Sequence, residues 1–409
     1  MVRQLAWEIL QKVFRQEVYS NIALSQTLRN SVLSEPDQRL LTQLVYGVIH
    51  TQKQLDYYLK PMIQGKKVSN AVRYLLLLSL YQLKFMDKIP DYAVLNESVE
   101  LAKTLRPQQD KFVNAILRNI KSPTEPMSEV EEYSVSEWLY KQLKGQYPKD
   151  YQQILASYLV EPKRSGRLNI IKATMDQAKQ AGFEASIVSP VGIILSQGNL
   201  AIHPWYQSGK LTIQDEASQR VAFAVDPQPG ERVLDMCAAP GGKATHLAEL
   251  MKNSGEVMAN DIYPHKADLI RQNVKRLGLT NVKITTEDAA RLADVYLAES
   301  FDRVLLDAPC TGWGVISRKP EIKYFTSSEK QDALIQIQIS LLDVASTLVK
   351  TGGILVYSTC TLNKGENEVQ VKTFLTRHPE FTLLDESLLL PHTYHTDGFY
   401  IATLRKGTT

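Results

Sequence analysis

The stretch RVLDMCAAPGGKATHLAEL (residues 232–250) decides the fold class of this chain. A short apolar run ends in a glycine turn, and the turn opens a helical pattern. Similar apolar runs follow at residues 256–262, 282–288, 303–309 and 352–360, with helical runs between them. Near-continuous apolar strands that alternate with helices predict an α/β fold, in which a doubly wound, Rossmann-like sheet carries helices on both faces.

The ends of these predicted strands hold the residues that can bind and react. In a doubly wound sheet, ligands bind outside the carboxyl ends of the strands. The three cysteines of the chain and four of its aspartates lie at these ends: Cys237, Cys310, Cys360, Asp235, Asp261, Asp288 and Asp307. This coincidence predicts a functional site along this edge of the sheet.

The glycine turn after the first strand indicates which ligand the site takes. A dinucleotide-binding turn needs G-x-G-x-x-G, which this stretch lacks. A P-loop needs glycine and then serine or threonine where this chain has Cys237 and Ala244. The looser turn that remains is typical of methyltransferases that bind S-adenosylmethionine, a ligand without phosphate groups.

Three charged residues are placed to suit this cofactor. Asp261 follows the glycines by about twenty residues, where a carboxylate can accept hydrogen bonds from both ribose hydroxyls. Asp288 can approach the adenine edge, and Lys243 can lie beside the methionine carboxylate. Each residue also has a plain structural reading, as a helix cap, a turn residue or a surface charge. Cys237 is read as a small residue packed against the cofactor.

The other two thiols suit methyl transfer to carbon 5 of cytosine, which reacts too poorly unaided. A thiolate that adds to carbon 6 makes carbon 5 an enamine carbon, and a base later removes the proton from carbon 5 so that the thiol leaves. Such a thiolate needs a partly electropositive pocket. Asp307, if protonated or sharing a proton, is placed as the acid near ring nitrogen 3. On these grounds either Cys310 or Cys360 can be the nucleophile, and both can also be buried small residues.

The rest of the sequence predicts three further parts. Residues 1–122 read as an all-α domain, and the first 120 residues hold 16 Lys and Arg against 10 Asp and Glu. This balance suits a nucleic-acid-binding module or a charged surface. Residues 123–140 are acidic, lack an apolar period and read as a linker. Residues 141–225 predict a small α+β subdomain, ahead of the sheet domain at 226–409.

Composition argues against several classes of protein. No apolar run approaches the roughly 20 residues that span a bilayer. Three cysteines without an even framework favour a reducing compartment, so we expect a cytoplasmic protein. The two histidines of HTYH (residues 392–395) have no acids or thiols at ligand spacing, and no metal site is expected.

Several motifs make the functional prediction specific. The sheet domain contains DMCAAPGGK, NDIYPHKADLIRQNVKRLG, DAPCTGWGVISRKPEIKY and YSTCTLNKGENEVQV, with QDEASQ before them and DGFYIATLRK after them. These stretches resemble the successive motifs of the Nol1/Nop2/Sun family of RNA cytosine-5 methyltransferases. SNIAL, YGVIHTQKQLDYYL, NESVELAK and KFVNAILR make the first 120 residues similar to the helical NusB-like RNA-binding domain. This pairing of domains points to the bacterial Sun branch, which methylates a cytosine in 16S ribosomal RNA.

The resemblance implies roles for the residues at the strand ends. Cys360, in the STCT motif, is the expected nucleophile, and Cys310, in DAPC, is expected to assist product release. The expected cofactor contacts are Cys237, Ala238, Ala239, Pro240, Gly241, Gly242, Lys243, Asp261, Asp288 and Asp307. Thr311, Lys364 and Ser317 stand where the family usually has Ser, Pro and a basic residue, and we expect only the third departure to weaken a phosphate contact.

The target cytosine must leave its stack to reach this edge, and the surrounding RNA is held through phosphate and shape. Arg167 and Asn169 match an RNA-facing element of the family. The other expected RNA contacts, which can also be merely solvated charges, are Lys163, Arg164, Arg318, Lys319 and Lys323. Trp313 can stack on a base or fill the core.

The sequence therefore predicts a monomeric enzyme that transfers a methyl group from S-adenosylmethionine to 16S rRNA, free or early in assembly. One alternative keeps the chemistry and changes the substrate to tRNA or another rRNA site. A second is a catalytically inactive RNA-binding assembly factor, against which the intact Cys310, Cys360 and Asp307 argue.

Overall fold

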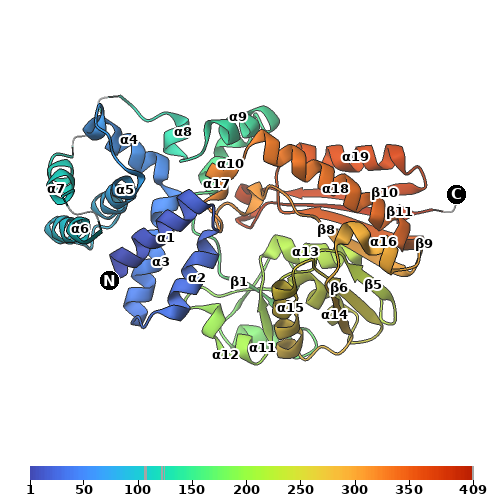
Figure 1. The fold of residues 1–409 in the computed structure, drawn as a ribbon. Helices are drawn as coiled ribbons and strands as arrows, with labels where there is room; N and C mark the ends of the chain where they lie inside the picture. The colour runs from blue at the N-terminus through green and yellow to red at the C-terminus, as the bar shows by residue number, and fades with distance from the viewer. Residues whose placement is uncertain (106–107, 121–122, 124, 408–409) are drawn as a thin grey trace. The chain divides into compact units, whose positions relative to one another are not determined.

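The structure, a computed structural model, describes residues 1–105, 108–120, 123 and 125–407. It divides into two compact units. The helical unit comprises residues 1–160 and 316–327, and the sheet unit comprises residues 161–315 and 328–409. Figure 1 colours the first helices blue to green and the large sheet with its helices yellow-green to red.

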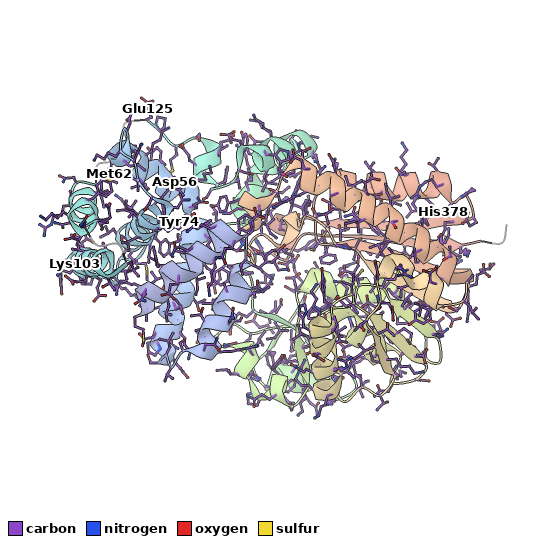
Figure 2. The ribbon with its side chains drawn as sticks, viewed as in Figure 1. Asp56, Met62, Tyr74, Lys103, Glu125 and His378 are labelled. Atoms are coloured by element: carbon purple, nitrogen blue, oxygen red, sulfur yellow. The ribbon has the colours of Figure 1, made fainter. Side chains whose placement is uncertain are left out.

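The helical unit is built around α5 (Asn70–Phe85), whose residues 74–82 are all buried. A helix that is apolar on all sides is stable only where other helices cover it. Five helices pack on it: α1 (Val2–Gln16), α3 (Glu35–His50), α4 (Gln52–Ile63), α6 (Asp91–Leu105) and α7 (Asp110–Arg118). Tyr74 of α5 stacks on Phe14 of α1 with ring centroids 5.4 Å apart (Figure 2). This unit confirms the predicted all-α N-terminal region.

The helical unit extends past the predicted linker. The remaining helices of its first segment are α2 (Ser20–Asn30), α8 (Glu129–Glu132), α9 (Glu137–Gln146) and α10 (Tyr151–Ser157). Ser128 caps α8, and the backbone N–H of Lys53 donates a hydrogen bond of 2.9 Å to Oγ of Ser134. The region read as a linker therefore packs on α4, and the compact unit ends at residue 160. The boundary expected at residue 122 lies outside the described residues.

A distant segment of the chain, residues 316–327, completes the helical unit and contains α17 (Ile322–Phe325). The buried carboxylate of Glu321 accepts hydrogen bonds from the backbone N–H of Ser20 at 2.9 Å and from its hydroxyl at 2.7 Å. Nζ of the buried Lys323 donates to the carbonyl oxygen of His50 at 2.7 Å. Sequence periodicity did not predict this insertion, because these partners lie nearly 300 residues apart in the chain.

The sheet unit contains a seven-stranded sheet in the order β10-β11-β9-β8-β5-β6-β7. Its strands are β5 (Arg232–Asp235), β6 (Glu256–Asn260), β7 (Val282–Thr285), β8 (Phe301–Asp307), β9 (Val349–Thr359), β10 (Phe381–Leu389) and β11 (Phe399–Lys406). Strands β5 to β9 pair in parallel, and β10 and β11 add an antiparallel edge. This order confirms the predicted Rossmann-like sheet. The strand order reverses between β8 and β5, which is where doubly wound sheets bind their ligands.

Helices cover both faces of this sheet, as the apolar runs predicted (Figure 1). One core joins the sheet to α13 (Glu216–Val225), α14 (Gly242–Leu250) and α15 (Pro264–Leu277). The other core joins it to α16 (Leu292–Val295), α18 (Ser328–Leu348) and α19 (Glu368–Arg377). At the end of α19, Nε2 of His378 lies 2.8 Å from Asp343 of α18 (Figure 2).

A second, small sheet in the order β2-β3-β1-β4 precedes the large one along the chain. Its strands are β1 (Ser165–Leu168), β2 (Glu184–Ala185), β3 (Gly192–Ile194) and β4 (Leu211–Ile213), and they pack with α11 (Met175–Gln180) around their own apolar cluster. α12 (Pro204–Gln207) lies next to β4. The predicted α+β subdomain is present within the sheet unit from residue 161 onward, whereas residues 141–160 of the range predicted for it belong to the helical unit.

Candidate active site

The two strand-end thiols predicted to react lie side by side. Strands β8 and β9 are parallel neighbours that pair Asp307 with Ser358, so the loops that follow them leave from the same edge. The Sγ atoms of Cys310 and Cys360 are 3.4 Å apart. The structure thus brings together two residues that the sequence places 50 positions apart.

Two glycines that we did not select from the sequence allow this approach. The backbone N–H of Gly314 donates to the carbonyl oxygen of Cys360 at 2.9 Å, and the N–H of Gly398 donates to that of Gly314 at 2.8 Å. A Cβ atom on Gly314 would lie 2.0 Å from the carbonyl oxygen of Gly398. Only glycine permits this backbone contact. The signal in the sequence was the GWG that follows the DAPC cysteine.

The pKa of Cys310 is raised well above its ordinary value. The hydrogen bond with Cys360 is the largest cause, followed by burial and by the negative charges of Cys360, Glu366 and Asp307. Cys310 therefore holds its proton while the sulfur of Cys360 lies beside it.

Lys243 and Asp307 form an ion pair beside the thiols. Nζ of Lys243 lies 2.7 Å from Oδ2 of Asp307, whose Oδ1 accepts a hydrogen bond of 2.8 Å from the hydroxyl of Ser358. Burial lowers the pKa of Lys243, but the charge and hydrogen bond of Asp307 outweigh it, so that pKa is raised. Lys243 was expected beside the methionine carboxylate, and in this structure its partner is Asp307.

The loop between β5 and α14 is fixed by a close backbone approach at Gly241 and by the carboxylate of Asp261. Gly241 adopts φ 99°, and a Cβ there would lie 3.2 Å from Cα of Ile270 in α15. Oδ2 of Asp261 accepts from the backbone N–H of Ala239 at 3.3 Å, and Oδ1 accepts from that of Tyr263 at 3.1 Å. The loop and the end of β6 are thus joined through the carboxylate that was predicted to bind ribose.

Asn260 supports the same region, although sequence reasoning missed it. Its buried amide donates to the carbonyl oxygens of Met236 at 3.1 Å and Glu287 at 3.0 Å, and thereby joins the ends of three strands. Asp288 is exposed, and Oδ1 accepts from the backbone N–H of Ala290 at 3.0 Å. This arrangement matches the structural reading of Asp288 as a helix cap and leaves Oδ2 available to a ligand.

Asp235 is a strand-end residue to which the sequence analysis assigned no role. Its carboxylate is fully buried, and no side chain among the described residues donates a hydrogen bond to it. Burial and the charge of Asp307 raise the pKa of Asp235 to about 7, although Lys243 acts in the opposite direction. A buried acid to which no side chain donates suits a positively charged ligand group, such as the ammonium group of an amino acid.

Cys237 belongs to the wall of the site. Burial, and then the negative charges of Asp235, Asp307 and Asp261, raise the pKa of its thiol far above the ordinary value. The side chain packs against the core on the α18 face of the sheet. These surroundings suit the packing role expected for Cys237 and disfavour a thiolate there.

Two of the expected RNA contacts are buried and need a different assignment. Arg167 is fully buried and donates to the carboxylate of Glu249 at 2.9 and 3.1 Å and to Thr245 at 3.1 Å, and also to Gln214 and the carbonyl oxygen of Gly242. Asn169 is buried and donates to the carbonyl oxygens of Gly209 and Leu277. The expectation that these side chains contact RNA is wrong for this conformation, because neighbouring protein atoms occupy their donors.

The other expected RNA contacts differ in exposure. Lys163, Arg164, Arg318 and Lys319 are partly or largely exposed, and Arg164 is hydrogen-bonded to Glu161 and to the carbonyl oxygen of Ser196. Lys323 is fully buried and is therefore corrected to an internal residue of the helical unit. Trp313 is also fully buried, which favours the second of its two readings, a core aromatic. RNA contact by Lys163, Arg164, Arg318 and Lys319 stays a prediction.

Two broader features are absent from the residues that the structure describes. No group of three or more histidine, cysteine, aspartate or glutamate side chains is arranged to hold a metal ion there. None of the helices in the described ranges combines the length and apolarity needed to cross a membrane.

The fold and this edge define a class. A doubly wound sheet with a glycine turn after β5, acids at the ends of β5 and β6 and two thiols after β8 and β9 is the architecture of a Rossmann-like methyltransferase. The family described as 16S rRNA methyltransferase RsmB/F matches residues 222–405, and the NusB family matches residues 1–122.

Known proteins are similar to this chain along nearly its whole length. The chain is 40% identical to the probable ribosomal RNA small subunit methyltransferase B of Bacillus subtilis (strain 168), over 99% of this chain and 98% of that protein. It is 33% identical to the ribosomal RNA small subunit methyltransferase B of Escherichia coli (strain K12), again over 99% and 98%. The chain belongs to the ribosomal RNA small subunit methyltransferase B family, which confirms the resemblance read from its motifs.

Solved structures share this fold. The crystal structure of PH0851 matches with a TM-score of 0.85 and 29% identity over 99% of this chain and 98% of that one. A methyltransferase homologue from Pyrococcus horikoshii matches with a TM-score of 0.62 and 28% identity, over 68% of this chain and 100% of its own.

Proposed function

We propose that this chain transfers a methyl group from S-adenosylmethionine to carbon 5 of a cytosine in 16S rRNA, with Cys360 as the nucleophile. The observation that carries the proposal is the 3.4 Å approach of Cys310 and Cys360, beside the Lys243–Asp307 ion pair. Carbon 5 methylation needs one thiol to add to the ring and a second group to take the proton from carbon 5.

The cofactor would be held by the β5–α14 loop and the acids around it. Asp261, placed at the end of β6, suits the ribose hydroxyls, and the buried Asp235 suits the ammonium group. Asp288 lies at the end of the next strand with one carboxylate oxygen free of the cap hydrogen bond. Bound S-adenosylmethionine would supply an electrophilic methyl group.

Cys360 begins the reaction by adding its sulfur to carbon 6, which shifts the ring electrons so that carbon 5 becomes nucleophilic. The ammonium group of Lys243 interacts with Cys360 and stabilises negative charge on its sulfur. Asp307 keeps Lys243 in place through their ion pair. As a carboxyl group that shares a proton, it is the proposed acid for ring nitrogen 3.

Cys310 completes the reaction after carbon 5 has taken the methyl group. Its hydrogen bond with Cys360, the largest cause of its raised pKa, is lost once the Cys360 sulfur is bonded to carbon. The Cys310 thiol then gives its proton to water more readily, and the resulting thiolate accepts the proton from carbon 5. The electron pair of that C–H bond restores the ring double bond and expels Cys360 as a thiolate.

The substrate is proposed from the relatives and from the helical unit. Both methyltransferase B relatives carry the small subunit ribosomal RNA in their names, and the NusB match covers most of the helical unit. We expect a monomeric cytoplasmic protein that acts on free or early-assembly 16S rRNA. The same chemistry on tRNA remains the alternative substrate, and an inactive assembly factor is disfavoured by the adjacent thiols.

The deciding experiment compares purified wild-type protein with Cys360→Ala on 16S rRNA and on tRNA. We expect 5-methylcytidine to form in 16S rRNA with wild type only, with cofactor binding retained in the variant. Bisulfite sequencing then identifies the base. Turnover by Cys360→Ala, or methylation of tRNA alone, would overturn the proposal.

A further inference from the structure

A buried carboxylate lies behind the two cysteine loops. Glu366, in η4 (Lys364–Glu366), is fully buried and accepts hydrogen bonds through both oxygens. Oε2 accepts from the backbone N–H of Thr311 at 2.9 Å and from the side-chain amide of Gln338 at 2.9 Å. Oε1 accepts from the amide of Asn363 at 2.9 Å and from the hydroxyl of Thr311.

These donors come from both loops and from the helix that covers them. Thr311 directly follows Cys310, and Asn363 lies three positions after Cys360. The amide of Gln338 in α18 also donates to the carbonyl oxygen of Pro309 at 2.9 Å. The hydroxyls of Thr311 and Thr361 lie 2.7 Å apart and link the loops directly. Glu366 is thus the common acceptor of groups that flank each thiol.

A charge in this position is costly to bury, and hydrogen bonds compensate it here. Among the described residues no lysine or arginine forms an ion pair with Glu366, so its charge rests on four donors from the protein. A purely apolar core would avoid this cost. The free-energy cost of burying this carboxylate is explained if the carboxylate has a functional role, and its contacts indicate that the role concerns the thiols.

We propose that Glu366 is a positioning residue that sets the distance and the proton placement between Cys310 and Cys360. The inference rests on the proposed function, because it explains why Cys360 adds to the ring while Cys310 takes the proton. Glu366 is assigned this role without a contact to the substrate or the cofactor. The charge of Glu366 also contributes to the raised pKa of Cys310, after the larger effects of Cys360 and burial and together with Asp307.

The first test measures geometry without RNA. Glutathione disulfide is equilibrated with the protein at neutral pH, where two protein thiols are converted to one Cys310–Cys360 disulfide and two glutathione thiols are released. The equilibrium constant reports how closely the thiols are held. Glu366→Gln presents an amide donor to donors, and we expect it to lower this constant by about tenfold, the effect of about one lost hydrogen bond.

A second test measures the pKa of Cys310 through the pH dependence of product release. In single-turnover methylation, the rising limb of the product-release rate should move to lower pH in Glu366→Gln, because removal of a nearby negative charge lowers the pKa of Cys310. Glu366→Asp keeps the charge and should keep the limb of wild type. A merely structural role would reduce the rates without moving the limb.

The matched control is Glu368→Gln, which changes a half-buried carboxylate two positions away. Among the described residues, the side chain of Glu368 forms no hydrogen bond with either cysteine loop. Thr311→Val removes one hydroxyl donor and serves if Glu366→Gln does not fold. The inference would be overturned if Glu366→Gln and Thr311→Val both gave the same disulfide equilibrium constant as Glu368→Gln and the same pH dependence of product release. Failure of wild type to methylate RNA would instead overturn the proposed function, since the disulfide equilibrium needs no RNA.

Discussion

Nζ of Lys243 and Oδ2 of Asp307 lie 2.7 Å apart in the site, and the carboxylate favours the charged form of the lysine. Burial alone would lower the pKa of Lys243, and Asp307 reverses the shift. The ion pair therefore keeps a cation beside Cys360 at every pH at which the protein is folded and Asp307 is ionised.

Asp307→Asn should make catalysis sensitive to alkaline pH. Without the carboxylate, burial dominates and the pKa of Lys243 falls below its ordinary value, so the cation is lost as pH rises through that lowered pKa. We expect single-turnover methylation to fall about 100-fold at neutral pH, the usual effect of removing one preorganised charged group from an active site. Asp294→Asn, an exposed residue paired with Arg291, is the control and should leave the pH profile unchanged. A variant profile parallel to that of wild type would contradict this role.

Cys310→Ser should trap the covalent intermediate. Serine cannot take the proton from carbon 5 as a thiolate does, so the bond between Cys360 and the cytosine persists. A denaturing gel should show a protein–RNA band of reduced mobility for Cys310→Ser and none for Cys360→Ser. Accumulation of the band with Cys360→Ser instead would exchange the two roles.

Arg167→Met should cost stability rather than RNA affinity. Its guanidinium group is fully buried against Glu249, and removal of one partner leaves an uncompensated carboxylate, a loss of about 3–5 kcal/mol in the free energy of unfolding. The double variant Arg167→Met/Glu249→Gln should recover part of that loss. Urea denaturation measures both, with the largely exposed Arg164→Met as a control that changes little. Full stability combined with weaker RNA binding would restore the direct contact.

The stability of the helical unit should rise with pH on the alkaline side because of Lys323. Burial lowers the pKa of Lys323 to about 7, below its ordinary value, so between about pH 7 and 10 the unfolded chain binds more protons than the folded one. Stability conferred by this effect therefore increases with pH over that window and is constant below it. Lys323→Met should remove the slope, as measured by thermal unfolding at several pH values. The neighbouring His50, whose pKa burial and Lys323 lower to about 3, stays neutral throughout. An identical slope in wild type and variant would rule out this account.

Local patterns in the sequence predict most of the sheet unit. The apolar runs that became β5 to β9 are near-continuous because both faces of a parallel sheet are covered, and the glycine turn marks where β5 gives way to α14. Strand ends meet at one edge in any such sheet, so Cys310, Cys360, Asp261 and Asp307 could be grouped before any coordinates were known. The relatives confirm the family that these motifs indicated.

Burial and partner choice could not be predicted from local patterns. Arg167 and Lys323 carry charges, and charges usually face solvent, yet partners distant in the chain bury both. The same limit hid Glu366, Asn260 and Gly314, whose importance lies in groups that they meet across loops.

The sequence by itself determined the doubly wound sheet, the methyltransferase turn and the presence of two thiols at strand ends, because these follow from short-range periodicity and spacing. Only the tertiary structure decided that residues 316–327 belong to the helical unit, that Lys243 pairs with Asp307 and that Glu366 links the two cysteine loops. Such pairings depend on which groups lose water together in the folded chain, and that is a property of three-dimensional contact rather than of order along the sequence.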